Sequence, residues 1–292
     1  MQQKITLSLA GCHQGQKLKG VEYGFTPFLS SLNKLFNKNY ELELLDFRTD
    51  KYFENPIYGS HILGNNIFTV SNYDSTFLTF GGDHTISYGT IIASKKLFDT
   101  IGYDTKVIWI DAHADINSPS SSLSGNCHGM PVSYLLGITK DNKLSNVYIN
   151  PEDLVYIGIR SLDKYEEQLL NNLKKEGLQV YTAKDVKEYG IEKILEIIED
   201  KWYNKHRKYK VHISLDVDSM DPKYTPATGT PVNGGLHPDD VIEIIKWGNK
   251  NSLYKMANLD ITEINPLLSD IGGVCKTYYT VNKILKNYLL AE

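Results

Sequence analysis

Residues 106–115 read KVIWIDAHAD, an apolar run that turns abruptly into acidic and histidine side chains. The unbroken apolar stretch Val107–Ile110 is typical of a central strand that is buried on both faces. Such strands belong to parallel sheets that are covered by helices on both sides. The segment therefore indicates an α/β fold with polar chemistry at the carboxyl end of a central strand.

Strand-like runs alternate with helix-length segments along the rest of the chain. The predicted strands are Ile5–Leu9, Glu41–Phe47, Thr76–Phe80, Lys106–Ile110, Leu154–Ile157, Leu178–Tyr181, Lys210–Leu215 and Met256–Ile261. The predicted helices are Pro27–Phe36, Ile86–Phe98, Pro131–Leu136, Tyr165–Lys175, Ile191–Tyr203, Pro238–Trp247 and Thr277–Leu290. Strands joined by single helices favour right-handed crossovers and parallel pairing. We expect residues 1–292 to form a single three-layer αβα domain with a central, mostly parallel, roughly eight-stranded sheet.

The composition excludes several classes of protein. The 292 residues carry a formal net charge of −4, so no nucleic-acid partner is expected. No apolar run approaches the length of about 18 residues that spans a membrane, and no signal-peptide segment precedes the first strand. Cys12, Cys127 and Cys275 are too few and too scattered for a disulfide framework or a thiolate metal site. We expect a cytoplasmic protein with no membrane partner.

Three predicted strands end in acidic and histidine residues. The segments are TFLTFGGDH at residues 76–84, KVIWIDAHAD at residues 106–115 and KVHISLDVDSMDP at residues 210–222. Residues two apart on an extended backbone project to the same side, so Asp111, His113 and Asp115 can converge on one point. The same holds for Asp216 and Asp218. The carboxyl ends of strands are where open α/β sheets build their sites.

Aspartates gathered at one sheet edge repel one another and raise one another's pKa values, and a bound cation resolves that conflict. Two histidines and four carboxylates without a cysteine suit borderline-to-hard divalent ions such as manganese. Four carboxylates would balance two such ions, and a bound hydroxide would leave a slightly negative site that suits a guanidinium. Alone, a D-x-D at a strand end is usually a turn or a cap, and Gly81-Gly82 is often a tight turn. Together the three segments predict a binuclear metal site.

In order and spacing these blocks resemble the ureohydrolase family and, within it, the arginases. Further matching blocks are GVEYG at residues 20–24, TPATGTP at residues 225–231 and LDITEINP at residues 259–266. The resemblance extends over nearly the whole chain. It implies an arginase-like fold and a hydrolase that cleaves L-arginine to L-ornithine and urea. A metal-bridging hydroxide would attack the guanidinium carbon.

The resemblance also implies two Mn(II) ions per chain. The ligands of the first ion would be His84, Asp111, Asp115 and Asp216. The ligands of the second ion would be His113, Asp111, Asp216 and Asp218. Asp111 and Asp216 would therefore bridge the two ions, and Asp115 would also hydrogen-bond the hydroxide.

Three further residues are implied to act on the guanidinium end of the substrate. Glu263 would hold the guanidinium. His128 would move protons between bulk water and the site, which suits an imidazole that titrates near neutrality. Thr230 would lie near the reacting guanidine, although a structural role in its loop is almost as good an interpretation.

The segment SGNCHG at residues 124–129 resembles arginases proper rather than agmatinases, whose substrate lacks an α-carboxylate. Asn117, Ser124 and Asn126 would bind the α-carboxylate through neutral donors. Alternatively, a Ser/Asn-rich loop satisfies only its own turns.

Asp163 and Glu166 are implied to receive the α-ammonium of the substrate. The family's Pro-Gly between these acids is absent here, which puts the loop geometry and Glu166 in doubt. Either acid could instead start the following helix, where carboxylates are favoured.

Several alternatives share the predicted fold. Agmatinase, guanidinobutyrase and formiminoglutamase would use the same metal ligands, and a one-metal amide deacylase is a further possibility. A catalytically silent binding protein would be expected to have lost a ligand, yet all six positions are intact. A homo-oligomer, either trimer or hexamer, is typical of the family. His212 alternates with Asp216 on one predicted strand, so it could lie beneath the site.

Overall fold

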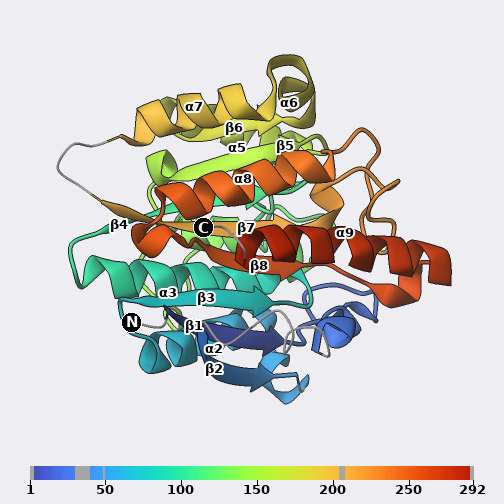
Figure 1. Cartoon of the computed structure of the whole chain (residues 1–292), viewed down its shortest axis with the longest axis horizontal. Helices are drawn as coiled ribbons and strands as arrows, with labels where there is room; N and C mark the ends of the chain where they lie inside the picture. Colours follow the sequence, from blue (N-terminus) through green and yellow to red (C-terminus); the bar gives the residue numbers. More distant parts are fainter. Residues whose placement is uncertain (1–2, 30–39, 49, 204–207, 290–292) are drawn as a thin grey trace.

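A sheet of eight parallel strands forms the centre of the computed structural model, which describes residues 3–29, 40–48, 50–203 and 208–289. The strands are β1 (Gln3–Ala10), β2 (Tyr40–Phe47), β3 (Ser75–Phe80), β4 (Asp104–Ile110), β5 (Leu154–Ile159), β6 (Gln179–Thr182), β7 (Tyr209–Asp216) and β8 (Asn258–Thr262). They lie in the order β2-β1-β3-β8-β7-β4-β5-β6 (Figure 1). The predicted α/β fold is confirmed, and every strand pair is parallel.

The order of the strands in the sheet differs from their order along the chain. After β3 the chain builds β4, β5 and β6, and it then returns to insert β7 and β8 between β3 and β4. The carboxyl ends of β3, β8, β7 and β4 consequently lie side by side although they come from distant parts of the sequence. Open α/β sheets bind ligands at such switch points.

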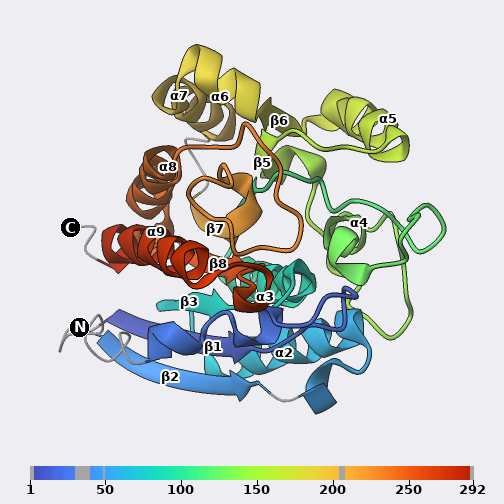
Figure 2. The same cartoon turned by 90° about the vertical axis from the view of Figure 1, so that its right-hand side faces the viewer.

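Helices cover both faces of the sheet. They are α2 (Pro56–Val70), α3 (Ser87–Asp99), α4 (Pro131–Leu135), α5 (Lys164–Leu173), α6 (Ala183–Tyr189), α7 (Ile191–Trp202), α8 (Pro238–Asn251) and α9 (Ile271–Leu289). Figure 2 shows α6 to α9 on one side of the sheet and α2 to α5 on the other. Within the described ranges, no helix combines the length and the apolar character needed to cross a membrane.

Strand β4 is buried on both faces, as its sequence predicts. Ile108 and Ile110 pack in the cluster that contains the apolar residues of α7, α8 and α9. Val107 and Trp109 pack in the cluster on the opposite face, with residues of α3, α4 and α5. All four side chains are fully buried, so the polar residues that follow Ile110 emerge from a rigidly packed element.

The sequence prediction missed α2 and α6. Helix α2 buries Gly59, Ser60 and Gly64 beside its apolar residues, and glycine is normally unfavourable inside a helix. A Cβ on Gly64 would stand 2.2 Å from the carbonyl oxygen of Gly89 in α3, so close packing of the two helices requires glycine here. Helix α6 is short and begins with a capping box at Thr182. Residues 30–36 of the predicted helix Pro27–Phe36 lie outside the described residues.

A buried polar seam joins β7 to α3 and β8. The imidazole of His212 lies between the hydroxyl of Ser94, 2.7 Å from Nδ1, and the carboxylate of Asp260, 3.0 Å from Nε2. Further along the same face of β7, Ser214 contacts Ser87 of α3. His212 therefore has a structural role in the core below the carboxyl edge, a position that the alternation along the strand allowed.

Lys210 lies on the same face of β7, nearer the start of the strand. Its Nζ donates to the carbonyl oxygen of Met256 at 2.7 Å and to Thr76 Oγ1 at 3.2 Å. Burial lowers the pKa of Lys210 from 10.5 to about 7. Between these pH values the unfolded chain binds more protons than the folded chain, so the free energy of unfolding rises with pH across this window.

We predict that Lys210→Met flattens this dependence. In urea unfolding between about pH 7 and pH 9, the wild type should gain more stability than the variant, by at most about 1.4 kcal/mol per pH unit. Lys250→Met, which changes an exposed lysine of α8, is the matched control and should keep the wild-type slope. Equal slopes for wild type and Lys210→Met would contradict the assigned burial of a titrating ammonium.

Candidate metal and substrate site

The six predicted metal ligands lie together at the carboxyl edge of the sheet. His84 begins the short helix η3 (His84–Ile86) after β3. Asp111, His113 and Asp115 follow β4, Asp216 is the last residue of β7, and Asp218 lies in η7 (Val217–Ser219). Two groups of side chains could each hold a cation: His84 with Asp111 and Asp115, and Asp111 with His113 and Asp218. Asp111 belongs to both groups, which is the position expected of a bridging carboxylate.

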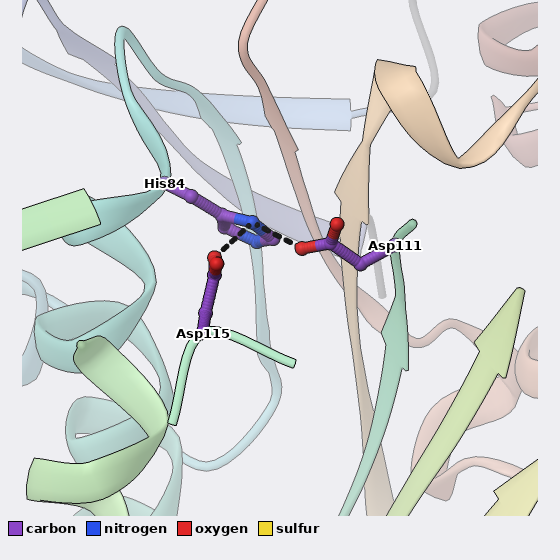
Figure 3. Close-up of side chains that lie close together, drawn as sticks. All are labelled: His84, Asp111 and Asp115. Carbon is purple, nitrogen blue, oxygen red and sulfur yellow. Dashed lines mark ion pairs between the residues drawn. The ribbon is translucent and has the colours of Figure 1, made fainter. Parts of the chain in front are cut away.

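The first group is centred on His84. Its Nδ1 lies 3.0 Å from a carboxylate oxygen of Asp111, 3.2 Å from one of Asp115 and 3.4 Å from one of Asp216. Figure 3 shows the first two carboxylates approaching the ring from different sides. Despite these short distances, the buried Nδ1 forms no hydrogen bond with any of them. The three carboxylates therefore converge on one ring nitrogen.

The tautomer of His84 explains this arrangement. Ser214 donates its hydroxyl proton to Ser87 Oγ at 2.8 Å, so Ser214 Oγ accepts from His84 Nε2–H, which lies 2.8 Å away. Burial lowers the pKa of His84, but the carboxylates of Asp111, Asp115 and Asp216 outweigh it and raise the pKa well above its ordinary value, so without a metal ion a proton on Nδ1 faces them. When the ring is neutral, Nδ1 presents a lone pair to these carboxylates instead. A lone pair facing anions is repulsive unless a cation lies between them. This donor set therefore fits a divalent metal ion.

The second group is centred on His113, whose Nδ1 lies 3.1 Å from Asp218 Oδ2 and 3.5 Å from Asp111 Oδ1. Asp115 reaches the site from a backbone with a φ of 50°, in the left-handed region that few residues other than glycine adopt. That turn brings Asp115 back towards His84 after the chain has left β4. Such strain is typical of a residue whose side-chain position is fixed by function.

The mutual repulsion of the carboxylates appears in their pKa values. Burial and the negative charge of Asp111 raise the pKa of Asp115 to about 7. Burial, Asp218 and Asp111 raise the pKa of Asp216 well above its ordinary value. For His113, burial lowers the pKa, but the carboxylates of Asp111 and Asp218 outweigh it and the pKa is raised to about 12. The site holds an excess of negative charge for which a proton or a metal ion must compensate.

Glu263, predicted to hold the guanidinium, lies beside the first group. Its backbone has a φ of 64°, and its side chain is 1% exposed. Oε1 accepts the backbone N–H of His84 at 2.9 Å and lies 3.0 Å from His128 Nδ1. Burial lowers the pKa of His128, but the charge of Glu263 outweighs it and raises the pKa to about 9. At neutral pH these two residues form a partly buried ion pair.

The residues predicted to bind the α-ammonium form a second cluster at the start of α5. Asp163 Oδ1 accepts the backbone N–H of Glu166, and Glu166 Oε2 accepts the backbone N–H of Asp163, which together form a capping box. Asp163 Oδ2 also accepts from Asn117 Nδ2 at 2.8 Å. Both acids therefore start the helix, the alternative that the sequence left open, and Asn117 ties the loop after β4 to this helix.

The remaining predicted residues divide into two kinds. Thr230 lies beside the predicted metal ligands, because its hydroxyl donates to Asp218 Oδ2 at 2.8 Å. Ser124 and Asn126 bond within their own turn, where Ser124 Oγ accepts the backbone N–H of Asn126 at 3.1 Å. No hydrogen bond of the described chain joins either residue to the predicted metal ligands.

The amino-acid sequence is similar to those of known proteins. The model of the Arginase family matches residues 51–289. Human arginase-1 is 36% identical over 278 residues, a match that covers 87% of this chain and 83% of that protein. The chain belongs to the arginase family. An arginase of Coccidioides immitis is 36% identical over 222 residues, and this match covers 72% of the chain but only 66% of the fungal protein.

The fold agrees with this membership of the arginase family. The crystal structure of Entamoeba histolytica arginase in complex with L-ornithine superposes with a TM-score of 0.85 at 28% identity. The superposition covers 99% of this chain and 98% of that one.

Two residues at the site of this arginase-family chain were not found by sequence reasoning. Arg160 follows β5, and its half-buried guanidinium donates to the carbonyl oxygens of Asp218 at 2.6 Å, Ser219 at 3.0 Å and Val232 at 2.8 Å. It thereby fixes the loop that carries Asp218. Gln16 donates through Nε2 to Glu263 Oε2 at 2.7 Å. Neither residue belongs to a charged motif, so only the folded chain reveals its role.

We predict that a divalent cation stabilises this chain through the converging carboxylates. Adding manganese to chelator-treated protein at about 100 times its Kd should raise the Tm by roughly 5–10 °C. Asp216→Asn should remove most of that increase, because it takes away a charged oxygen that faces His84. Asp200→Asn, at an exposed position on α7, should leave the increase intact. A full increase in Asp216→Asn would place the cation elsewhere.

Proposed function

We propose that this chain is an arginase that hydrolyses L-arginine to L-ornithine and urea with two Mn(II) ions. The observation that carries the proposal is the pair of His/Asp groups that share Asp111, with the buried carboxylate of Glu263 beside them. His84, Asp111, Asp115 and Asp216 would hold one ion, and His113, Asp111, Asp216 and Asp218 the other. When bound, two such ions supply a hydroxide nucleophile at neutral pH.

The residues of the chain would orient the reacting group. A guanidinium is cationic and planar, and Glu263 offers it a buried negative charge at the edge of the metal groups. The carbon of a guanidinium is a poor electrophile because resonance spreads electrons over it. Fixing that carbon beside the metal groups therefore lowers the barrier by proximity and orientation.

His128 would supply a proton to the departing amine. In the metal-free site its pKa is raised to about 9, chiefly by Glu263, which it contacts, and this favours the protonated imidazole at neutral pH. The amine of ornithine leaves only when it gains a proton, so a protonated group beside the guanidinium has the right charge state for this step. The side chain is 18% exposed, which allows the proton to be replaced from water.

The distal end of the site favours an α-amino acid. Asn117 offers a neutral donor and Asp163 a carboxylate, and the two side chains are in contact. Such a pair suits the carboxylate and ammonium of arginine. The Entamoeba arginase structure was solved with L-ornithine, the product of the proposed reaction, which supports the same choice of substrate here.

The competing candidate is a ureohydrolase that acts on a guanidino compound other than arginine. Both carboxylate oxygens of Asp163 already accept hydrogen bonds, and Ser124 bonds within its own turn. Agmatine lacks the α-carboxylate, and guanidinobutyrate lacks the α-ammonium, so either would need fewer of these groups. A catalytically silent protein is disfavoured because all six ligand positions retain their side chains.

The test is a substrate panel with manganese-loaded protein. Urea is measured with arginine, agmatine and guanidinobutyrate, and formamide is measured with formiminoglutamate. The proposal requires arginine to have the highest kcat/KM. A preference for agmatine would replace arginase by agmatinase and leave the metal assignment untouched.

The proposal also includes the molecular setting. We infer a cytoplasmic enzyme, in keeping with three free cysteines, Cys12, Cys127 and Cys275. We further infer a homo-oligomer, either trimer or hexamer, with no nucleic-acid or membrane partner. Light scattering of the purified full chain would test the oligomeric state.

His128→Asn should lower turnover of arginine roughly 100-fold or more, because it removes a general acid. Asparagine retains a donor towards Glu263, so the metal content and the KM should change little. Added imidazole should restore part of the rate. His237→Asn, at an exposed helix start, is the control and should behave as wild type. Loss of manganese from His128→Asn would reclassify this residue as a ligand.

Asp163→Asn should separate the ammonium contact from the helix cap. Asparagine caps a helix about as well as aspartate, so the start of α5 should persist while the negative charge is lost. We expect the transition state for arginine to lose about 1.5–3 kcal/mol of stabilisation, the range for hydrogen bonds to charged groups. This loss corresponds to a fall in kcat/KM of roughly 10-fold to 150-fold. Guanidinobutyrate has no ammonium and should lose much less. Equal losses for the two substrates would remove Asp163 from the ammonium site.

A further inference from the structure

The loop of residues 11–20, between β1 and η1 (Val21–Tyr23), closes over the guanidinium end of the site. The backbone N–H of Gly15 donates to Asp83 Oδ2 at 2.8 Å, and the carbonyl oxygen of Gly15 accepts the backbone N–H of His128 at 3.1 Å. The next residue, Gln16, sends its side chain to Glu263. The loop is therefore tied to three parts of the site by separate hydrogen bonds.

Glu263 has an unusual set of donors for a buried carboxylate. Its Oε1 is occupied by the backbone N–H of His84 and by His128. Its Oε2 is contacted by Gln16 Nε2 at 2.7 Å. Within the described chain, Gln16 is the one side chain that donates a hydrogen bond to Oε2. Without this bond the carboxyl group would be held through Oε1 alone, so its plane would be less firmly set about the last torsion, which is broad.

We propose that Gln16 is a positioning residue that sets the plane of the Glu263 carboxylate for the guanidinium. This inference rests on the proposed function. A planar guanidinium pairs with a carboxylate through parallel N–H···O bonds, so the plane and not only the charge of the carboxylate must be set. Holding the acid in that plane before the substrate arrives reduces the cost of orientation.

The neutrality of Gln16 is essential to this role. A carboxamide satisfies Oε2 without neutralising the carboxylate, so the negative charge remains available to the substrate. A lysine at the same place would form an ion pair with Glu263 and compete with the guanidinium. Gln16 is also half-buried beside Gly229, and a Cβ at position 229 would stand 3.2 Å from Gln16 Oε1, so glycine there leaves room for the amide.

The test compares Gln16→Leu and Gln16→Lys with wild type, using arginine and agmatine as substrates. Gln16→Leu should lower kcat/KM roughly 10-fold to 100-fold, the effect of one lost hydrogen bond to a charged group. The factor should be the same for both substrates, because they share the guanidinium and differ only at the distant end. Gln16→Lys should raise KM more than Gln16→Leu does, since its ammonium competes for Glu263. Gln14→Leu, in the same loop, is the control and should retain wild-type kinetics.

Three results would overturn the inference. They are unchanged kinetics in Gln16→Leu, a loss confined to arginine, and a loss accompanied by a matching fall in Tm or manganese content. The last would mark Gln16 as a merely structural residue. If the wild type hydrolyses agmatine and not arginine, the proposed substrate fails while the role of Gln16 remains testable on agmatine. If it hydrolyses neither, calorimetric binding of guanidine to wild type and Gln16→Leu decides, and equal affinities reject the role.

Discussion

The concentration of negative charge at one edge of the sheet is the constraint on which the rest of the site depends. Asp111, Asp216 and Asp218 are almost completely buried, and Asp115 is 8% exposed. The fold fixes these acids individually. Asp216 Oδ1 accepts the backbone N–H of Asp218 at 2.7 Å, while Asp216 Oδ2 faces His84. One oxygen is thereby committed to the protein and the other left to a cation, so the carboxylates converge in spite of their repulsion.

Contacts with residues of the sheet also hold the side chains of His84 and Asp111 in place. The ring of His84 stacks on Trp109, with ring centres 4.0 Å apart, and its Nε2 is held by Ser214. Trp109 in turn donates through Nε1 to Asp111 Oδ2 at 2.9 Å. These contacts join residues of or after β3, β4 and β7, whose register is set by one sheet, so a shift of one strand would disturb the ligand positions together. The polar seam that continues through His212 and Asp260 extends the same face of β7 into the core.

The part of the molecule that could be predicted from sequence is the part encoded in consecutive residues. The strand KVIWI and the aspartates behind it predict both the sheet and its metal edge, because period-two geometry acts locally. Helix α2 was missed because its contact with α3 depends on Gly64 meeting Gly89, a tertiary requirement that looks locally unfavourable. Gln16 and Arg160 were missed for a similar reason. An isolated glutamine or arginine has no pattern, and its meaning arises only from a partner more than fifty residues away.

The ion pair of His128 with Glu263 adds a last step to the proposed chemistry. In the free site the charge of Glu263 raises the pKa of His128 to about 9, which holds the proton on the imidazole. A guanidinium bound at the same carboxylate brings a second positive charge close to His128, and like charges lower the pKa of a cation. In the proposed reaction the substrate would therefore loosen the proton that its own leaving amine needs. Gln16 makes this coupling workable, because a neutral donor on Oε2 leaves the carboxylate its full charge to divide between the imidazole and the guanidinium.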